Sequence, residues 1–121
     1  MIKKHFDVPL YDFNVAILEV ENDDDAPALD KYLKSCRMSG DVTNEIIEAV
    51  KNGDVDGGWT ISNLGQKRFV VVFLKTRTPT TRDKIVGHEK RHVEDDILKH
   101  CGVKDDEAAA YLAGFLSTKF K

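Results

Sequence analysis

The sequence predicts an α+β fold in which a small antiparallel or mixed sheet packs against helices. Segments with strand-like alternation lie near the N-terminus and in the middle of the chain, and segments with helical spacing of apolar residues lie between and after them. At 121 residues the chain is long enough for one hydrophobic core and too short for two. We therefore expect a single domain over residues 1–121.

The first predicted elements are a strand-like region and two helices. Residues 6–20 alternate between apolar and polar side chains, with a turn near Pro9. An acidic loop over residues 21–25 leads into a helix that runs to about Cys36, and a second short helix stops at Asn52. The buried stripes are expected to consist of Leu29, Tyr32 and Leu33 in the first helix and of Ile46, Ile47 and Val50 in the second.

The second half of the chain is expected to contain a hairpin and two further helices. A strand-like segment at residues 59–61 leads through a turn at residues 63–66 into the apolar run Phe69–Leu74, which predicts a central strand. A long third helix follows and is expected to end near Cys101. The acidic segment Asp105-Asp106-Glu107 opens the last helix, where negative charge suits the positive end of the helix dipole.

The charge and hydropathy of the chain argue against binding to nucleic acid or to a membrane. The net charge is −3, without a basic stripe suited to a phosphate backbone. No apolar run approaches the length of a membrane span, and the N-terminus lacks the apolar segment of a secretory signal, so we expect a cytoplasmic protein. Cys36 and Cys101 are interpreted as free thiols, with a bridge between them left open.

The most informative motif is the pentad His88-Glu89-Lys90-Arg91-His92 in the third helix. Two histidines four residues apart lie on one face of a helix, so both imidazoles can reach a single metal ion. The glutamate between them is placed to take a proton from metal-bound water. The pentad therefore predicts a zinc site with His88 and His92 as ligands and Glu89 as general base. A solvated or structural cluster without metal is the alternative.

A helical wheel places both histidines and Glu89 on the side of the helix that is expected to be buried. Lys90 and Arg91 fall on the opposite side, toward solvent. This orientation favours a metal site over a chance occurrence of the pattern. The buried sector is expected to contain Ile85, His88, Glu89, His92, Val93, Asp96 and Ile97.

A catalytic zinc site also needs a third protein ligand and an open position for water. Glu107 is the preferred candidate, because a helix–turn–helix arrangement could bring it back against the pentad; Asp106 is the fallback. Asp96 is preferred as a hydrogen-bond acceptor for a ligand imidazole rather than as a ligand. His100 is expected to be exposed or to cap the helix end. The alternative for Glu107 is a surface acid that complements the helix dipole.

These residues resemble those of the gluzincins, the zincin metallopeptidases with His-Glu-x-x-His on one helix and a glutamate ligand on a following helix. The chain is similar in particular to small phage- and prophage-type zincin-like proteins, in which a short apolar strand, the active-site helix, a glycine stop and an acidic segment running into Glu-x-x-Ala-Tyr-Leu follow one another. The matching segments are Val70–Leu74, Ile85–His92, Gly102 and Asp106–Leu112. The N-terminal half agrees only in the coarse order of its elements.

The resemblance implies a zinc-dependent peptidase with an unknown peptide or protein substrate. It implies zinc held by His88, His92 and Glu107, with Glu89 as general base. It also implies that the strand at Phe69–Leu74 lies near the cleft, where such a strand can pair with extended peptide substrate.

Two features leave the function open at this point. An oxyanion donor is missing from the pattern, and Tyr111, one turn after Glu107, is a candidate that also suits a core position. Lys90 and Arg91 replace the uncharged residues that are usual in peptidases of this class. The alternative function is a non-catalytic, zinc-stabilised interaction or regulatory domain that retains the pentad.

Overall fold

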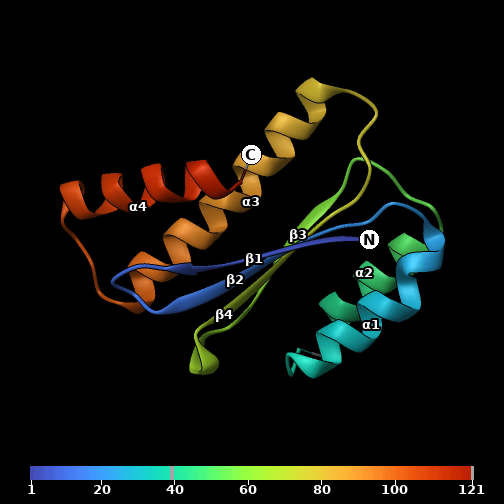
Figure 1. Ribbon diagram of the computed structural model, residues 1–121, viewed down its shortest axis with the longest axis horizontal. Helices are drawn as coiled ribbons and strands as arrows, with labels where there is room; N and C mark the ends of the chain where they lie inside the picture. Colours follow the sequence, from blue (N-terminus) through green and yellow to red (C-terminus); the bar gives the residue numbers. More distant parts are fainter. Residues whose placement is uncertain (39, 121) are drawn as a thin grey trace.

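The computed structural model describes residues 1–38 and 40–120 and contains a four-stranded mixed sheet with helices on both faces (Figure 1). The strand order is β1-β2-β4-β3; β1 pairs with β2 and β3 with β4 in antiparallel fashion, whereas β2 and β4 are parallel. This arrangement confirms the predicted α+β class. The strands are β1 (Ile2–Val8), β2 (Phe13–Glu19), β3 (Gly58–Asn63) and β4 (Arg68–Phe73).

The region read as strand-like at the N-terminus is a β-hairpin. The predicted turn near Pro9 is confirmed, and two of its residues, Leu10 and Asp12, have the positive φ angles of 72° and 57° that reverse the chain. Within the hairpin, Phe6 lies opposite Val15. Both side chains belong to the core on the same face of the sheet, as expected from the two-residue period of a strand.

Helices α1 (Ala26–Ser35) and α2 (Asp41–Lys51) cover one face of the sheet. Leu29 and Leu33 are fully buried, which confirms two members of the stripe predicted for the first helix, and Tyr32 lies partly buried beside them. Before α1, residues 23–25 form a short 3-10 turn that Asn22 caps. The first core, between these helices and the sheet, is built mainly from Ala16, Leu18, Leu29, Leu33, Ile46, Val50, Val70 and Val72.

Helices α3 (Pro79–His100) and α4 (Asp106–Lys119) cover the opposite face (Figure 1). The Thr78 side chain caps α3 by accepting a hydrogen bond from the backbone N–H of Thr81 at 3.1 Å. Gly102 follows α3 with a φ angle of 66°, the left-handed conformation that ends many helices. The second core is built mainly from Phe13, Val15, Phe69, Val71, Val93, Ile97, Leu112 and Leu116.

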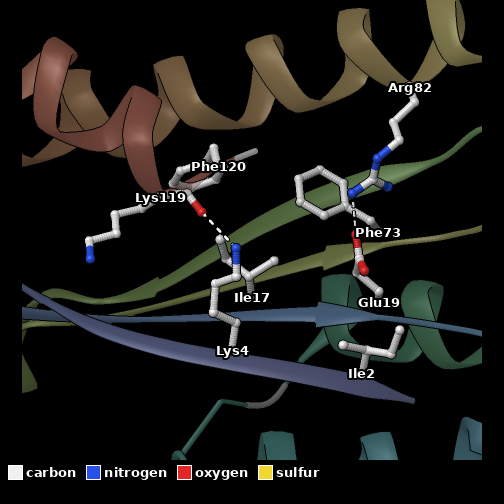
Figure 2. A pocket seen from close by; sticks show the side chains of 8 residues that line it. All are labelled: Ile2, Lys4, Ile17, Glu19, Phe73, Arg82, Lys119 and Phe120. Atoms are coloured by element: carbon white, nitrogen blue, oxygen red, sulfur yellow. Dashed lines mark hydrogen bonds and ion pairs between the residues drawn. The ribbon is translucent and has the colours of Figure 1, made fainter.

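Polar contacts tie the two C-terminal helices to the strands (Figure 2). Arg82, near the start of α3, forms an ion pair with Glu19 of β2 and lies 5.7 Å from the centre of the Phe73 ring. Lys4 of β1 donates a hydrogen bond from Nζ to the carbonyl oxygen of Lys119 at 3.1 Å. These contacts place the beginning of α3 over the ends of β2 and β4, and the end of α4 over β1.

Two further predictions concern the state of the cysteines and the presence of membrane-spanning helices. Cys36 is buried and Cys101 is exposed, and neither forms a disulfide, as the interpretation of free thiols requires. No helix within residues 1–38 and 40–120 combines the length and the apolar character that crossing a bilayer requires.

Candidate metal centre

The two histidines of the pentad converge on one point at the surface of α3. The Nε2 atoms of His88 and His92 lie 3.1 Å apart, and both side chains are exposed. A tetrahedral zinc ion that binds two imidazoles at about 2.0–2.1 Å holds their nitrogens about 3.3 Å apart. The spacing of the pair is therefore close to that of two histidines sharing one zinc ion. Without a metal, the same geometry allows one imidazole to donate a hydrogen bond to the other.

Glu89 lies beneath the histidines and is buried, with 5% of its surface exposed. The hydroxyl group of Thr60, on β3, donates a hydrogen bond to Oε1 of Glu89 at 2.9 Å. Burial of a carboxylate is costly unless such a partner compensates for lost hydration. Ligand atoms of His88, Glu89 and His92 all lie within 4.8 Å of one another. The structure therefore brings the two predicted ligands and the predicted base together.

Gly58 allows α3 to approach β3 this closely. A Cβ atom at this position would lie 2.7 Å from Cγ2 of Ile85 and 3.3 Å from Cγ of Glu89, both on α3. The first distance is shorter than side-chain packing permits. A glycine at position 58 is thus a requirement for the contact between Thr60 and Glu89.

The cluster opens into a pocket of about 260 Å³ between α3 and the edge of the sheet. One wall is β3, which within the described part of the chain pairs with β4 alone and forms an edge of the sheet. Residues 69–74 do not line this pocket, and β4 pairs with β2 on one side and with β3 on the other. The predicted central position of this strand is therefore confirmed, but the strand has no free edge at which a peptide substrate could pair. The pocket is lined by Gly58, Trp59, Thr60, His88, Glu89, His92 and Asp96.

Asp96 lies in this pocket one turn beyond His92 and is half-buried. No hydrogen bond joins its carboxylate to either histidine in the described part of the chain. Its predicted role as an acceptor for an imidazole N–H is therefore compatible with its position, and it stays a prediction.

The structure does not bring Glu107 to the histidines. Glu107 is exposed in the first turn of α4, and the cluster of potential metal ligands found among the described residues, His88, Glu89 and His92, does not include it. After His92, α3 continues to His100, about 12 Å at 1.5 Å per residue, so the chain turns back well beyond the pentad. In Figure 1 the first turn of α4 lies far from the middle of α3. Asp106, the fallback, is exposed in the same turn.

The path of α4 gives a further reason for this separation. Phe115 of α4 packs against Phe6 of β1, so α4 lies on the β1 side of α3. The histidines instead share a pocket with β3, at the other edge of the sheet. The carboxylate of Asp105 accepts a hydrogen bond from the backbone N–H of Glu107 at 2.9 Å. This first turn thus has the features of a capped helix start with complementary acidic charge, which was the alternative for Glu107.

The two other candidates also lie outside the pocket. Tyr111 is 57% exposed on α4, so it is not a core residue. It also does not line the pocket that contains the two histidines. His100 is exposed, as expected, and its ring meets the edge of Phe13 at 5.8 Å between centres.

The buried stripe of α3 differs from the predicted one. Val93 and Ile97 are fully buried, whereas the two histidines are exposed, so the stripe is centred on Val93 and the histidines lie at its border. Lys90 was expected to point into solvent, but its side chain is only 21% exposed and forms an ion pair with Glu94. The shift arises because α3 packs against both the sheet and α4. Arg91, with a side chain 80% exposed, does face solvent as predicted.

Sequence reasoning missed Thr60 and Gly58. Thr60 contacts a residue 29 positions away, and no local pattern connects the two. Gly58 lies just before the strand-like segment expected at residues 59–61 and is the first residue of β3. The adjacent glycines at positions 57 and 58 were a usable signal, since glycine in a strand often marks a close approach of another backbone or helix.

Comparison of the chain with protein-family models, with curated proteins and with solved structures finds no match. The likeness to gluzincins therefore depends on the sequence motifs alone. The geometry of the pocket is an independent observation that bears on the metal site itself.

Proposed function

We propose that this chain is a zinc-dependent hydrolase that cleaves an amide bond in a peptide. His88 and His92 would hold the metal, and Glu89 would act as general base. The observation that supports this assignment most directly is the convergence of the two Nε2 atoms, 3.1 Å apart, directly beside a buried glutamate in an open pocket.

The protein supplies the orientation of the base. The hydroxyl of Thr60 engages Oε1 of Glu89 and thereby leaves Oε2 to accept a proton from water and return it to the leaving amine. A bound zinc ion would supply an acidified water molecule and polarise the scissile carbonyl. The low exposure of Glu89 restricts bulk water around the carboxylate, which strengthens its interactions with the reacting groups.

The edge strand β3 supports a peptide as the substrate class. Its sequence, Gly-Trp-Thr-Ile-Ser-Asn, contains no charged residue, and no strand formed by residues 1–38 or 40–120 lies beside its outer edge. The other edge strand, β1, carries Lys3, Lys4 and Asp7, which discourage pairing. An extended peptide can add to the unprotected edge of β3 through backbone hydrogen bonds, next to the histidines.

A second candidate is a non-catalytic zinc-binding domain. The observation that favours it is the ligand set, because two histidines converge with a carboxylate that Thr60 already engages, while Glu107 lies elsewhere. Zinc in such a site would stabilise the fold without turning over a substrate.

Metal analysis combined with the Glu89→Gln variant separates these functions. Protein purified without added metal should contain zinc close to one equivalent, and His88→Ala or His92→Ala should lose it, whereas His100→Ala, on the same helix, should keep it. For a hydrolase, Glu89→Gln retains zinc and loses at least about a hundredfold in turnover of a fluorogenic peptide mixture. Zinc binding with no hydrolysis by the wild-type chain would support the second candidate. Absence of zinc uptake would exclude both candidate functions.

A further inference from the structure

A second groove lies on the other face of β3, between this strand and α2. It has a volume of about 370 Å³ and an apolar floor formed by Ala49, Val55, Trp59 and Leu74. Val55 is 44% exposed there, which is high for an apolar side chain. Trp59 lines both this groove and the pocket of the metal centre. We call this second hollow the tryptophan groove.

The two hollows lie on either side of one edge strand. Successive side chains of a strand point to opposite faces, and β3 follows this rule. Thr60 points to α3, where it bonds Glu89, whereas Trp59 and Ile61 pack toward the core beneath α1 and α2. A peptide paired with the outer edge of β3 has the same alternation. If one of its side chains lies over the metal centre, the next lies over the tryptophan groove.

The charge of the groove selects among possible side chains. Its rim carries the carboxylates of Glu45, Glu48 and Asp54, and no lysine or arginine is among its lining residues. Glu48 has a loose ion pair with Lys51 at 3.9 Å. Neither Glu45 nor Asp54 has an ion-pair partner within the described part of the chain. A glutamate or aspartate side chain would be repelled here.

A long cationic side chain matches both the shape and the charge. The aliphatic part of lysine or arginine can cover the apolar floor while its charged end stays near the rim, as such side chains commonly do. The indole of Trp59 lines the groove, and the faces of indole rings attract cations. A purely apolar side chain fills the floor but gains nothing from the carboxylates.

We propose that the tryptophan groove is a specificity pocket for a lysine or arginine side chain of an extended peptide bound along β3. The basic residue would be a neighbour of the residue placed over the metal centre. This inference rests on the proposed function for its position beside the cleaved bond. The binding of the basic side chain is a separate property, which can be measured without catalysis.

The test uses the zinc-loaded Glu89→Gln protein and three peptides that differ at one position. The probes are acetyl-Thr-Val-Lys-Val-Thr-amide and its counterparts with norleucine or glutamate in place of lysine. Trp59 is the only tryptophan of the chain, so its fluorescence reports occupation of the groove. We expect the lysine peptide to bind roughly fivefold to tenfold more tightly than the norleucine peptide and the glutamate peptide to bind most weakly.

A charge-matched pair of variants locates the effect. Glu45→Gln combined with Asp54→Asn should reduce the preference for lysine over norleucine to less than about twofold. Asp24→Asn combined with Asp83→Asn removes the same charge from two exposed positions outside the groove and should leave the preference intact. Circular dichroism checks that all variants are folded.

The outcomes separate this inference from the proposed function. Equal binding of the lysine and norleucine peptides, binding of none of the three, or an undiminished preference in the Glu45→Gln, Asp54→Asn variant would overturn the specificity pocket. A lysine preference that depends on Glu45 and Asp54 supports it, even if the wild-type chain hydrolyses no peptide and the proposed hydrolase is thereby excluded. Hydrolysis by the wild-type chain without any preference for a basic residue would support the proposed hydrolase and overturn the specificity pocket.

Discussion

The hydrogen bond between Thr60 and Glu89 joins strand β3 to the residue proposed as general base. A glutamate between two metal-ligating histidines is exposed to several competing partners, since it can bind the metal, turn to solvent or pair with a nearby cation. The hydroxyl of Thr60 restrains one oxygen and keeps the carboxylate directed into the pocket. In the proposed reaction Thr60 would therefore act through Glu89, as a positioning residue.

Replacement of Thr60 tests this role. We expect Thr60→Val to leave zinc content unchanged and to lower kcat by about tenfold to a hundredfold with little change in KM, which corresponds to the loss of one hydrogen bond to a charged group. Thr60→Ser retains the hydroxyl and should recover most of the rate. Steady-state kinetics on a fluorogenic peptide measures both constants. Equal kcat values for the valine and serine variants would show that the hydroxyl does not position the base.

Asp96 and Glu107 are expected to differ in their effect on metal affinity. Asp96 lines the pocket and should orient a ligand imidazole, so Asp96→Ala is expected to weaken zinc affinity by about tenfold. Glu107 lies in the first turn of α4, and we expect Glu107→Ala, like its neighbour Asp106→Ala, to leave the affinity unchanged within about twofold. Competition with a chromophoric chelator gives the three values. A sharp loss for Glu107→Ala alone would mean that α4 approaches α3 differently when zinc is bound.

Among the elements, the contact of α3 with β3 depends on one missing side chain. Gly58→Ala would place a methyl group 2.7 Å from Cγ2 of Ile85, so either the Ile85 side chain or the helix itself must shift. We expect this substitution to reduce the free energy of unfolding by about 1–3 kcal/mol, as overpacked sites do. Gly87→Ala, whose new methyl group meets nothing within 4 Å, should instead stabilise α3 by up to about 1 kcal/mol. Urea denaturation followed by circular dichroism measures both, and equal effects of the two alanines would contradict the steric explanation.

The loops that enter β3 and α3 are joined by Asp56 and Arg77. The Asp56 carboxylate accepts a hydrogen bond from the backbone N–H of Arg77 at 2.9 Å and pairs with its guanidinium, and both contacts hold the pKa of that carboxyl below its ordinary value of 3.8. A lowered pKa means that the contact stabilises the fold at pH values above 3.8 and is lost as the pH falls through the value in the folded protein.

Asp56→Asn should therefore lower Tm at neutral pH. Asparagine also tolerates the positive φ angle of 61° at this position, so the effect reports the charge rather than backbone strain. The difference in Tm from the wild-type chain is expected to shrink once the pH drops below 3.8. Thermal denaturation at pH 7, 5 and 3 follows it, with Asp23→Asn as control. A difference that stays constant over this range would exclude the ionic contribution.

For the whole molecule, the local patterns in the sequence were sufficient to predict the elements. The alternation within residues 6–20, the stripe of Leu29 and Leu33, and the apolar run at residues 69–74 each correspond to observed strands or a helix. The pentad predicted the convergence of its own histidines, because their spacing belongs to the helix itself. Such features depend only on the regular repeat of side-chain directions within one helix or one strand.

What could not be predicted depends on which elements become neighbours. The apolar run at residues 69–74 predicts a central strand but not which strands flank it. The resemblance therefore placed this strand beside the cleft, at the position that β3 occupies in the structure. The direction of α4 was equally open, and with it the position of Glu107. A helical wheel of α3 alone does not show that this helix packs against both the sheet and α4. Lys90, expected to face solvent, is therefore half-buried.

Zinc should stabilise the whole domain if both histidines bind it. A ligand present at a hundred times its Kd contributes about 2.7 kcal/mol, which for a domain of this size raises Tm on the order of 10 °C. Differential scanning fluorimetry with and without zinc measures the shift, and a chelator should reverse it. His88→Ala should remove the response to zinc, whereas His5→Ala on β1 should retain it. A shift of the same size in His88→Ala would place the metal elsewhere.

The parallel pairing of β2 with β4 has a consequence for the order in which the protein folds. The two strands belong to residues 13–19 and 68–73, so their pairing closes a long loop and is expected to be slow. β3 joins the sheet through β4 alone, and Glu89 is oriented through β3. A free peptide of α3, or a nascent chain that has not yet paired these strands, can therefore present two histidines to a metal ion but no positioned base. On this basis the proposed metal site could bind its ion before the chain folds, whereas the proposed hydrolysis would require the folded sheet.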